Sequence, residues 1–417
     1  MRSVKIGIFG VKRGGNYIEH ILANNGDIVA LCDKDEEYLK KAVEKVGGDV
    51  KCYTDFDEFI NHEGMEAVFL ANYFHEHAPF AIKCLERDIH VLSECTSNST
   101  MAEGVALVRA AEKSKAFYML AENYPYMIFN QEIKRICDEG TLGKVLYAEG
   151  EYNHPGNPYT SEGKSDLFDD LKHWRNFLPK TYYVTHSLAP IMFATGANPV
   201  KVTALPICDP APTDGYGASH VIEKAAVMTT LNDDGSVFKF QGHSAYGGEF
   251  NSYRVCGKKG MIENLRHEDN IIMLRYNEWE KPEGMEARNR YQATIDHDPD
   301  AELIKKAGHG GGDFCVIREF FKAITTNTPH PFDAYFSTRM ASVAIQAHRS
   351  LMAGGMPYEI PDFRKEEDRV KFENDNDSPF WYSDGRAPTI PCTSVPEYGP
   401  SEQQIENYCK AVGCDKN

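Results

Sequence analysis

The feature that most constrains the fold lies at the N-terminus, where an apolar strand pattern is followed by a glycine-rich turn and a helical pattern. The strand pattern covers residues 4–9, the turn is Gly10-Val-Lys-Arg-Gly14-Gly15, and the helical pattern covers residues 17–22. Glycine permits a tight turn and a close approach to a phosphate, and a helix N-terminus offers N–H groups with a partial positive charge. This order predicts a cradle for the phosphates of a dinucleotide.

The glycine positions and one acidic residue favour NAD as that dinucleotide. Gly10 and Gly15 match the first and last glycines of the dinucleotide fingerprint, whereas Lys12 occupies the middle position. Lys12 either places its ammonium near a phosphate or points into solvent on a slightly reshaped turn. A second strand pattern, 28–32, ends at Asp33, about 20 residues beyond the turn, where a carboxylate accepts hydrogen bonds from the adenosine ribose. Alternatively, Asp33 only opens the next helix, since acidic residues favour a first helical turn.

Strand and helix patterns alternate through the first part of the chain. Further apolar strand patterns cover residues 67–71, 89–92 and 116–120, with a helical pattern at 79–85. Alternation of this kind predicts an α/β domain with a doubly wound parallel sheet, a Rossmann domain, which we assign to residues 1–122.

The pattern changes after residue 122 and predicts a second, α+β domain over residues 123–365. A helix is expected at 128–139, strands at 145–154, 200–205, 225–231, 236–242, 252–256 and 271–276, and helices again at 312–324 and 335–352. The Gly, Asn and Asp turns between the strands indicate an open, largely antiparallel sheet. Residues 366–417 form a C-terminal extension whose Phe380-Trp381-Tyr382 is expected to pack on its own subunit or on a neighbour.

Composition indicates an enzyme without nucleic-acid or membrane partners. The chain of 417 residues is long enough for two cores. Its net charge of −17, with no basic cluster, opposes binding to phosphate backbones. No stretch approaches the roughly 20 apolar residues of a membrane span. The first strand pattern leaves no room for a signal peptide, and the 11 cysteines contain no C-x-x-C pair, which is typical of reduced thiols in the cytoplasm.

These motifs are similar to those of the Gfo/Idh/MocA family, NAD(P)-dependent enzymes that act mostly on sugars and cyclitols, over about residues 3–365. The dehydrogenases of that family use a lysine in a Glu-Lys-Pro segment, an aspartate, and a histidine four residues after it. Here the segment is Ser93-Glu94-Cys95-Thr96 and the aspartate position is Tyr182, while the histidine matches His186. Two of the three catalytic groups are therefore replaced.

One branch of the family looks closer, the NAD-dependent glycosidases of glycoside hydrolase family 109, typified by α-N-acetylgalactosaminidases. Four clusters resemble that branch in the same order, together with the closing Pro-Asp-Phe. They are Glu149-Gly-Glu-Tyr152-Asn-His154, Trp174-Arg175, Tyr183-Val-Thr-His186-Ser-Leu-Ala-Pro190, His309-Gly-Gly-Gly-Asp313 and Pro361-Asp362-Phe363. Val184 replaces a proline of the pattern, and the extension is additional.

The resemblance implies roles for particular residues. Catalytic acid/base groups would be His186 and Tyr183, with Glu149 as a second carboxylate. Cofactor-binding residues would be Gly10, Lys12, Gly15, Asp33, Asn72, His77, Glu94, Asn123, Trp174 and Arg175. Substrate-binding residues would be Tyr152, His154, His309 and Asp313. Several have an ordinary alternative. His186 could be a helix residue whose ring bonds the backbone, and Tyr183 could be ordinary packing. Glu149 could lie on an exposed strand face, and the glycines after His309 could only open a helix that Asp313 starts. No ligand spacing compels a metal site, and Cys95 is expected to be a small buried side chain.

Three functions follow from the resemblance. In the first, bound NAD oxidises a sugar or glycoside at C3, elimination and addition of water follow, and the hydride returns, which is a redox-neutral glycosidase. In the second, the enzyme is a net sugar or cyclitol dehydrogenase or a keto-sugar reductase. In the third, the protein is a catalytically silent NAD-binding regulator. The resemblance also implies a homo-oligomer, a dimer or a tetramer.

Overall fold

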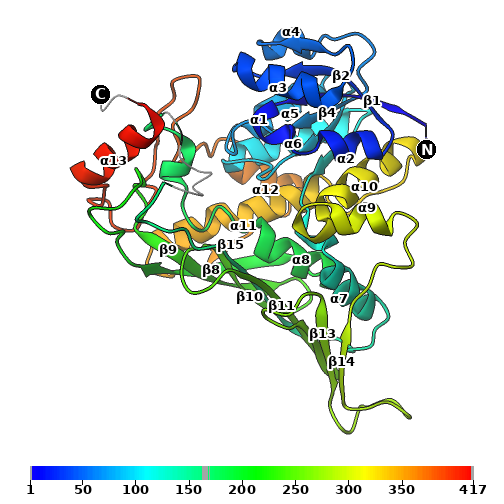
Figure 1. The fold of residues 1–417 in the computed structure, drawn as a ribbon. Coiled ribbons are helices and arrows are strands. Elements are labelled where there is room, and N and C mark those ends of the chain that lie inside the picture. The colour runs from blue at the N-terminus through cyan, green and yellow to red at the C-terminus, as the bar shows by residue number, and fades with distance from the viewer. Residues whose placement is uncertain (1, 162–167, 169, 415–417) are drawn as a thin grey trace. The chain divides into compact units, whose positions relative to one another are not determined.

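The computed structural model of the chain describes residues 2–161, 168 and 170–414, and these residues divide into two compact units (Figure 1). Unit 1 contains the residues up to 135 together with 291–341 and 362–375. Unit 2 contains residues 136–290, 342–361 and those from 376 onward. Each unit is therefore built from segments that are distant in the sequence. The domain boundaries that the sequence predicted, at residues 122 and 365, stay a prediction.

A six-stranded parallel sheet forms the centre of unit 1. Its strand order is β3-β2-β1-β4-β5-β6, so the order reverses at β1, as in doubly wound dinucleotide-binding sheets. The predicted Rossmann fold is confirmed. The strand β3 was not predicted, because its side chains are mostly exposed and carry no apolar pattern. The strands are β1 (Val4–Phe9), β2 (Gly26–Cys32), β3 (Lys51–Tyr53), β4 (Ala67–Leu70), β5 (His90–Ser93) and β6 (Tyr118–Leu120).

The glycine turn of unit 1 leads into two helices rather than one. The glycine turn was expected to lead into one helix near residue 17, but a short helix starts directly after Gly10 and a second starts at Ile18. The helices are α1 (Val11–Gly14), α2 (Ile18–Ala23), α3 (Glu36–Val46), α4 (Phe56–Phe59), α5 (His77–Leu85), α6 (Met101–Lys113), η1 (Tyr124–Tyr126), α9 (Ala301–Lys306), η3 (His309–Gly311), α10 (Gly312–Thr326) and α12 (Glu366–Phe372). Two more helices, α7 (Ile128–Asp138) and α11 (Ala334–Met352), have residues in both units.

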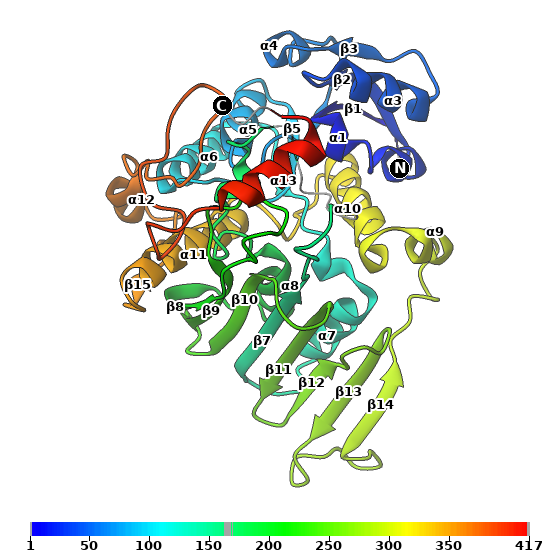
Figure 2. The same cartoon turned by 60° about the vertical axis from the view of Figure 1, so that its left-hand side comes forward.

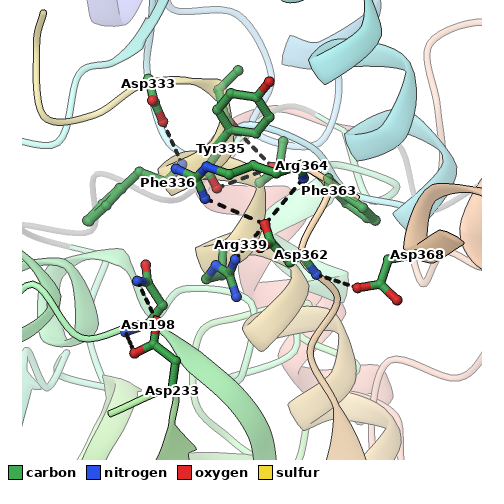
Figure 3. A network of polar contacts seen from close by, with 12 residues as sticks. Asn198, Asp233, Asp333, Tyr335, Phe336, Arg339, Asp362, Phe363, Arg364 and Asp368 are labelled. Carbon is green, nitrogen blue, oxygen red and sulfur yellow. Dashed lines mark hydrogen bonds and ion pairs between the residues drawn. The ribbon is translucent and has the colours of Figure 1, made fainter. Parts of the chain in front are cut away.

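The segment 362–375 is fastened to the first turns of α11 by an ion pair and a stacked cation (Figure 3). Asp362 Oδ1 lies 2.7 Å from Nη2 of Arg339, whose side chain is buried. The Arg364 guanidinium lies 4.4 Å from the centre of the Tyr335 ring. Phe363, which stands between Asp362 and Arg364 in the sequence, is buried. The Pro-Asp-Phe motif therefore holds this segment in place, and the contacts of Asp362 and Phe363 are structural.

A nine-stranded sheet forms the centre of unit 2, and Figure 2 shows several of its strands side by side. Its order is β14-β13-β12-β11-β7-β10-β9-β8-β15. Strands β7 and β10 pair in parallel. The antiparallel pairs are β7–β11, β11–β12, β12–β13, β9–β10, β8–β9 and β8–β15. The predicted open, largely antiparallel sheet is confirmed. The strands are β7 (Val145–Asn153), β8 (Pro199–Cys208), β9 (Glu223–Asn232), β10 (Val237–Ser244), β11 (Phe250–Gly257), β12 (Gly260–Asn264), β13 (Ile271–Tyr276), β14 (Arg288–Gln292) and β15 (Tyr358–Glu359).

The helix α8 (Thr185–Thr195) lies directly on the central strand β7 of this sheet. A Cβ atom at Gly150 of β7 would lie 1.9 Å from the carbonyl oxygen of Ser187, so any larger residue would push the helix away. The hydroxyl of Tyr253 on β11 also donates a hydrogen bond to the carbonyl of His186. These two contacts fix the first turn of α8 over the middle of the sheet.

The aromatic triplet of the C-terminal extension packs within its own chain, in the part from residue 376 onward that belongs to unit 2. Phe380 is fully buried, and its ring centre lies 5.4 Å from that of Tyr182. Farther along, α13 (Glu402–Val412) buries Tyr408 and Cys409 against Ala218.

Across the described part of the chain, no helix combines the length and the apolar character needed to cross a membrane.

Candidate active site

The glycine turn of unit 1 has the geometry of a phosphate cradle. Gly10 has a φ of 88°, and a Cβ there would lie 2.4 Å from the carbonyl oxygen of Ala71, so the turn requires glycine. Asp33 follows β2 and accepts a hydrogen bond from the backbone N–H of Val11 at 2.8 Å. At Gly15 a Cβ would lie 2.6 Å from the carbonyl oxygen of Val11. The predicted positions Gly10, Gly15 and Asp33 therefore meet at the start of α1.

The two basic residues of the turn point to different neighbours. Lys12 is exposed, and its Nζ lies 5.2 Å from the centre of the Tyr38 ring. Arg13, which the sequence analysis did not single out, forms an ion pair of 2.6 Å from Nε to Oε1 of Glu94. Of the two alternatives for Lys12, the geometry favours a solvent-facing side chain. Arg13 instead joins the turn to the predicted residue Glu94, and only the tertiary contact identifies it.

A buried carboxylate links the turn to the His309 segment within unit 1. Asp313 Oδ1 accepts hydrogen bonds from the Tyr17 hydroxyl at 3.0 Å and from Asn123 Nδ2 at 2.7 Å. Asp313 Oδ2 lies 2.8 Å from Nδ1 of His309. Arg13 in turn donates to the Tyr17 hydroxyl at 3.3 Å. His309, Asp313 and Asn123 therefore lie together, and the contact with Asp313 orients the His309 ring.

Electrostatics favour the charged forms of this pair. The hydrogen bond to Asp313 raises the pKa of His309, against the opposing effect of burial. Burial alone would raise the pKa of Asp313, but the hydrogen bond and positive charge of His309 hold it at about 2. Burial also raises the pKa of the Tyr17 hydroxyl. A carboxylate that accepts three hydrogen bonds fixes the ring of its histidine partner, which leaves the other ring nitrogen to face a ligand.

The predicted residue His77 is enclosed rather than exposed. Its Nδ1 lies 2.9 Å from the carbonyl oxygen of Thr96, its Nε2 lies 3.3 Å from that of Asn72, and burial lowers its pKa. His77 therefore orders the two loops that follow β4 and β5.

Two buried amide oxygens in unit 1 fit a ligand with hydroxyl or amide donors. Within residues 2–161, 168 and 170–414, Oδ1 of Asn72 and Oδ1 of Asn123 have no hydrogen-bond partner. Buried polar atoms are nearly always satisfied, so each one indicates a missing partner. A dinucleotide carries ribose hydroxyls and a carboxamide that can donate to such oxygens. Together with the glycine turn and Asp33, these acceptors fit bound NAD.

The position of the usual catalytic lysine is occupied by a buried thiol. Cys95 is 8% exposed, and its Sγ lies 3.1 Å from Oε2 of Glu122, which is fully buried. The thiol donates this hydrogen bond to the Glu122 carboxylate. The expectation of a small buried side chain at Cys95 agrees with this position.

In unit 2, five aromatic side chains that include the predicted acid/base pair gather over the sheet, and we call them the histidine–tyrosine cluster. The hydroxyl of Tyr183 lies 3.4 Å from Nε2 of His186. The ring of Tyr152 lies edge-on to that of His186, with centres 5.0 Å apart. The members are Tyr152, His154, Tyr183, His186 and His243. Tyr183 and His186 both carry groups that can give or take a proton, and their hydrogen-bond distance suits them to acid/base chemistry.

Sequence reasoning missed His243 in this cluster and the lysine beside it. His243 lies on β10, 5.5 Å from Tyr152 and 5.8 Å from Tyr183 between ring centres. Lys180 Nζ lies 3.3 Å from Nδ1 of His243. Lys180 and His243 are 63 positions apart, so no local motif connects them, and the close packing of the loop before α8 on Gly242 of β10 brings them together. His154, a predicted substrate residue, lies at the exposed edge and contacts Oε1 of Glu249 through Nδ1 at 2.9 Å.

The proposed second carboxylate, Glu149, lies on the other face of the sheet. Successive side chains on a strand point to opposite faces, and Gly150 and Tyr152 of β7 face α8. Glu149 instead contacts Arg254 at 2.8 Å and Lys239 at 3.6 Å. Burial would raise the pKa of Glu149, but the hydrogen bond from the Tyr147 hydroxyl and these two cations lower it. The structure therefore corrects this expectation and removes Glu149 from the group around His186.

The remaining predicted residues of unit 2 have structural contacts of their own. Trp174 and Arg175 form the 3-10 turn η2 (Trp174–Phe177), where the Arg175 guanidinium lies 4.5 Å from the centre of the Trp174 ring. Tyr182, at the position of the family aspartate, is 1% exposed and packs on Phe380 and His348. A cofactor role for Trp174 and Arg175 stays a prediction. Tyr182 belongs to the core.

No group of three or more His, Cys, Asp or Glu side chains in the described ranges is arranged to hold a metal ion. The cluster histidines are instead surrounded by tyrosines and a lysine.

Two family models match the chain. Residues 4–122 match the oxidoreductase family with the NAD-binding Rossmann fold, Gfo/Idh/MocA. Residues 226–369 match the C-terminal domain of glycosyl hydrolase 109.

Curated relatives are similar over most of their length. A glycosyl hydrolase family 109 protein of Stenotrophomonas maltophilia is 22% identical over 87% of this chain and 89% of the relative. An alpha-N-acetylgalactosaminidase of Tannerella forsythia is 22% identical over 87% of this chain and 86% of the relative.

Solved structures share the fold. An oxidoreductase domain protein from Kribbella flavida has a TM-score of 0.72 at 18% identity, over 87% of this chain and all of that one. Levoglucosan dehydrogenase in complex with NADH and L-sorbose has a TM-score of 0.72 at 16% identity, over 87% of this chain and all of that one.

Proposed function

Because the chain belongs to the Gfo/Idh/MocA family of NAD-dependent enzymes and carries the glycosyl hydrolase 109 C-terminal domain, we propose that it is a redox-neutral, NAD-dependent glycosidase. The observation that carries the proposal is the hydrogen-bond distance between the Tyr183 hydroxyl and His186 Nε2 over the sheet of unit 2. Such a pair can remove a proton from a sugar carbon and return it. The glycine turn, Asp33, Asn72 and Asn123 are the residues that would hold NAD.

The chemistry divides between the cofactor and the protein. When bound, NAD supplies reversible hydride transfer at a ring carbon, which we place at C3. A ketone at C3 acidifies the proton on C2. We assign removal of that proton to the Tyr183–His186 pair: the Tyr183 oxygen takes the C2 proton while its own hydroxyl hydrogen passes to His186 Nε2, and the same transfers in reverse return a proton to C2. The leaving group then departs from C1, water adds there, and the proton returns to C2.

The chain's own residues supply position and protons in this scheme. The cluster rings of Tyr152 and Tyr183 offer apolar faces for a sugar ring, and their hydroxyls offer hydrogen bonds. His186 is 8% exposed, so most of its side chain is shielded from bulk solvent. Cys95 replaces the lysine that serves family dehydrogenases as proton donor, which favours acid/base work by the cluster.

The first test is to incubate the purified protein with catalytic NAD and a panel of aryl glycosides. Aryl α-N-acetylgalactosaminides come first, because a relative with that name is similar over 87% of this chain. Aglycone release and NADH absorbance are followed together. Release without net NADH, lost when NAD is stripped, supports the glycosidase. NADH that accumulates in step with an oxidised sugar moves the protein to the dehydrogenases. Bound NAD with neither signal favours a regulator.

A second test follows the C2 proton. In D₂O, a glycosidase that passes through a 3-keto sugar exchanges that proton with solvent, so the released sugar carries deuterium at C2. A hydrolase that uses two carboxylates leaves C2 protonated. Product NMR distinguishes the two. The matched control for His186→Gln is His297→Gln, because His297 is an exposed histidine of unit 1.

A further inference from the structure

Lys180 and His243 form a contact in unit 2 that no sequence motif indicates. Lys180 Nζ lies 3.3 Å from His243 Nδ1, and Lys180 is only partly exposed. The rings of Tyr152 and Tyr183 lie beside His243. The ammonium group is therefore one side chain removed from the proposed acid/base pair.

The backbone is shaped to make this contact. A Cβ at Gly242 would lie 1.8 Å from the carbonyl oxygen of Lys180, so the loop before α8 rests directly on β10 only because this residue is glycine. The pairing of β10 with β7 also shifts register here, with Phe240 opposite Gly150 but His243 opposite Tyr152. Strand β10 thus has one residue more than β7 between these pairs, which is a β-bulge, and a bulge changes the direction in which a side chain points. The bulge sets His243 beside Tyr152.

The contact determines which nitrogen of His243 carries its proton. An ammonium group has three donors and no acceptor, so His243 Nδ1 must accept the hydrogen from Lys180. A neutral imidazole that accepts at Nδ1 carries its own hydrogen at Nε2. His243 is then a hydrogen-bond donor toward the rest of the cluster.

The surroundings keep that ring neutral. Burial lowers the pKa of His243 well below its ordinary value, and the positive charge of Lys180 lowers it further. Arg175 of η2, His154 of β7 and His186 of α8 act in the same direction. The rings of Tyr152 and Tyr183 also face His243, with ring centres 5.5 Å and 5.8 Å away.

We propose that Lys180 is a positioning residue that holds His243 as the Nε2–H tautomer, so that His243 donates this hydrogen to the ketone oxygen of the bound sugar. The inference rests on the proposed function. When the C2–H bond breaks, the proton goes to Tyr183 and His186, and the electron pair moves into the neighbouring carbonyl, whose oxygen becomes negative. The His243 hydrogen stabilises that oxygen without leaving its nitrogen, as an oxyanion-hole donor does.

The tautomer is tested without substrate, in the full-length protein with ¹⁵N-labelled histidine. Long-range ¹⁵N–¹H NMR spectra distinguish Nε2–H from Nδ1–H rings, and the His243 signal is identified by its loss in His243→Gln. We expect a neutral Nε2–H ring from about pH 6 to 8. Lys180→Met should mix the tautomers and raise the pKa of the ring, and Lys180→Arg should restore the single form. A charged or Nδ1–H ring in the unsubstituted protein overturns the proposal.

The catalytic part is tested on a glycoside that the enzyme turns over. His243→Gln should lower kcat about 100-fold or more, as loss of one oxyanion donor does. Lys180→Met should lower kcat with a smaller change in KM and shift the acidic limb of the pH profile upward, and Lys180→Arg should recover most of the loss. Lys258→Met, at an exposed turn of unit 2, is the matched control. An unchanged kcat in Lys180→Met overturns the proposal.

The two tests separate this inference from the proposed function. If no glycoside is turned over, the proposed function fails, and the inference fails with it even where NMR shows the expected tautomer. If glycosides are turned over but the tautomer is wrong, only the inference fails. Unfolding midpoints of the variants show whether a loss of activity comes from loss of the fold.

Discussion

The hydroxyl of Tyr183 lies 3.4 Å from Nε2 of His186, at the start of a helix that rests directly on the central strand of unit 2. If this pair moves the C2 proton, His186→Gln should lower kcat by about 100- to 10,000-fold, the range of general acid/base catalysis. Tyr183→Phe removes the partner hydroxyl while the ring stays, and it should lower kcat in a similar way. Aglycone release checks both variants, and equal NAD binding in both shows that the loss lies in proton transfer.

Glu149→Gln should leave kcat within about twofold of the unsubstituted enzyme, because partly exposed ion pairs contribute little. The carboxylate contacts Arg254 and Lys239 on the face of the sheet away from α8. The same glycoside assay measures the effect. A loss as large as that of His186→Gln would return Glu149 to the catalytic group.

Asp33→Ala should weaken NAD binding by about tenfold or more, since hydrogen bonds to a charged carboxylate contribute about 1.5–3 kcal/mol. The change also removes the acceptor of the Val11 N–H, so the glycine turn loses part of its support. Fluorescence titration with NAD and NADP measures both affinities, and NADP should lose less than NAD. The control is Asp49→Ala, at an exposed position outside the turn.

Asp313→Asn should lower the stability of unit 1 by about 1–3 kcal/mol, because buried donors lose the carboxylate that accepts their hydrogen bonds. The size of this loss should depend on pH. The raised pKa of His309 means that its share of stability is present below pH 6.5 and is lost as pH rises through the raised value. The lowered pKa of Asp313, about 2, means that its share is present above about pH 3.8 and is lost toward pH 2. Unfolding midpoints should therefore differ most between these limits. A constant difference up to pH 9 would contradict the pairing.

Phe380→Ala should destabilise unit 2 by about 3–5 kcal/mol, the usual cost of a large cavity in a core. Its ring is fully buried against Tyr182. Denaturant unfolding gives the cost. The matched control is Trp381→Ala, because the neighbouring indole is partly exposed and contacts Lys172 at 4.5 Å, so a smaller loss is expected. Equal losses would mean that the extension is only loosely attached.

Local spacing predicted the contacts that local geometry makes. The spacing of three residues predicted the Tyr183–His186 pair, although Tyr183 itself precedes α8. His309 and Asp313 are four residues apart, and their contact is made across Gly310 and Gly311, whose positive φ separates His309 from α10. The strands of unit 1 other than β3 were recognised because buried parallel strands are continuous apolar runs. Strand β12 was not recognised, because its alternating pattern of only five residues is short.

The sequence by itself determined the dinucleotide-binding fold, the glycine turn with Asp33, and the Tyr183–His186 pair, since each depends on residues that are close in the chain or on a simple period. Only the tertiary structure decided that Glu149 faces away from His186, that Arg13 rather than Lys12 joins Glu94, and that Lys180 meets His243. Those outcomes depend on strand register, on one bulge and on glycines that permit close packing. Such features are set by long-range pairing, and no local pattern contains them.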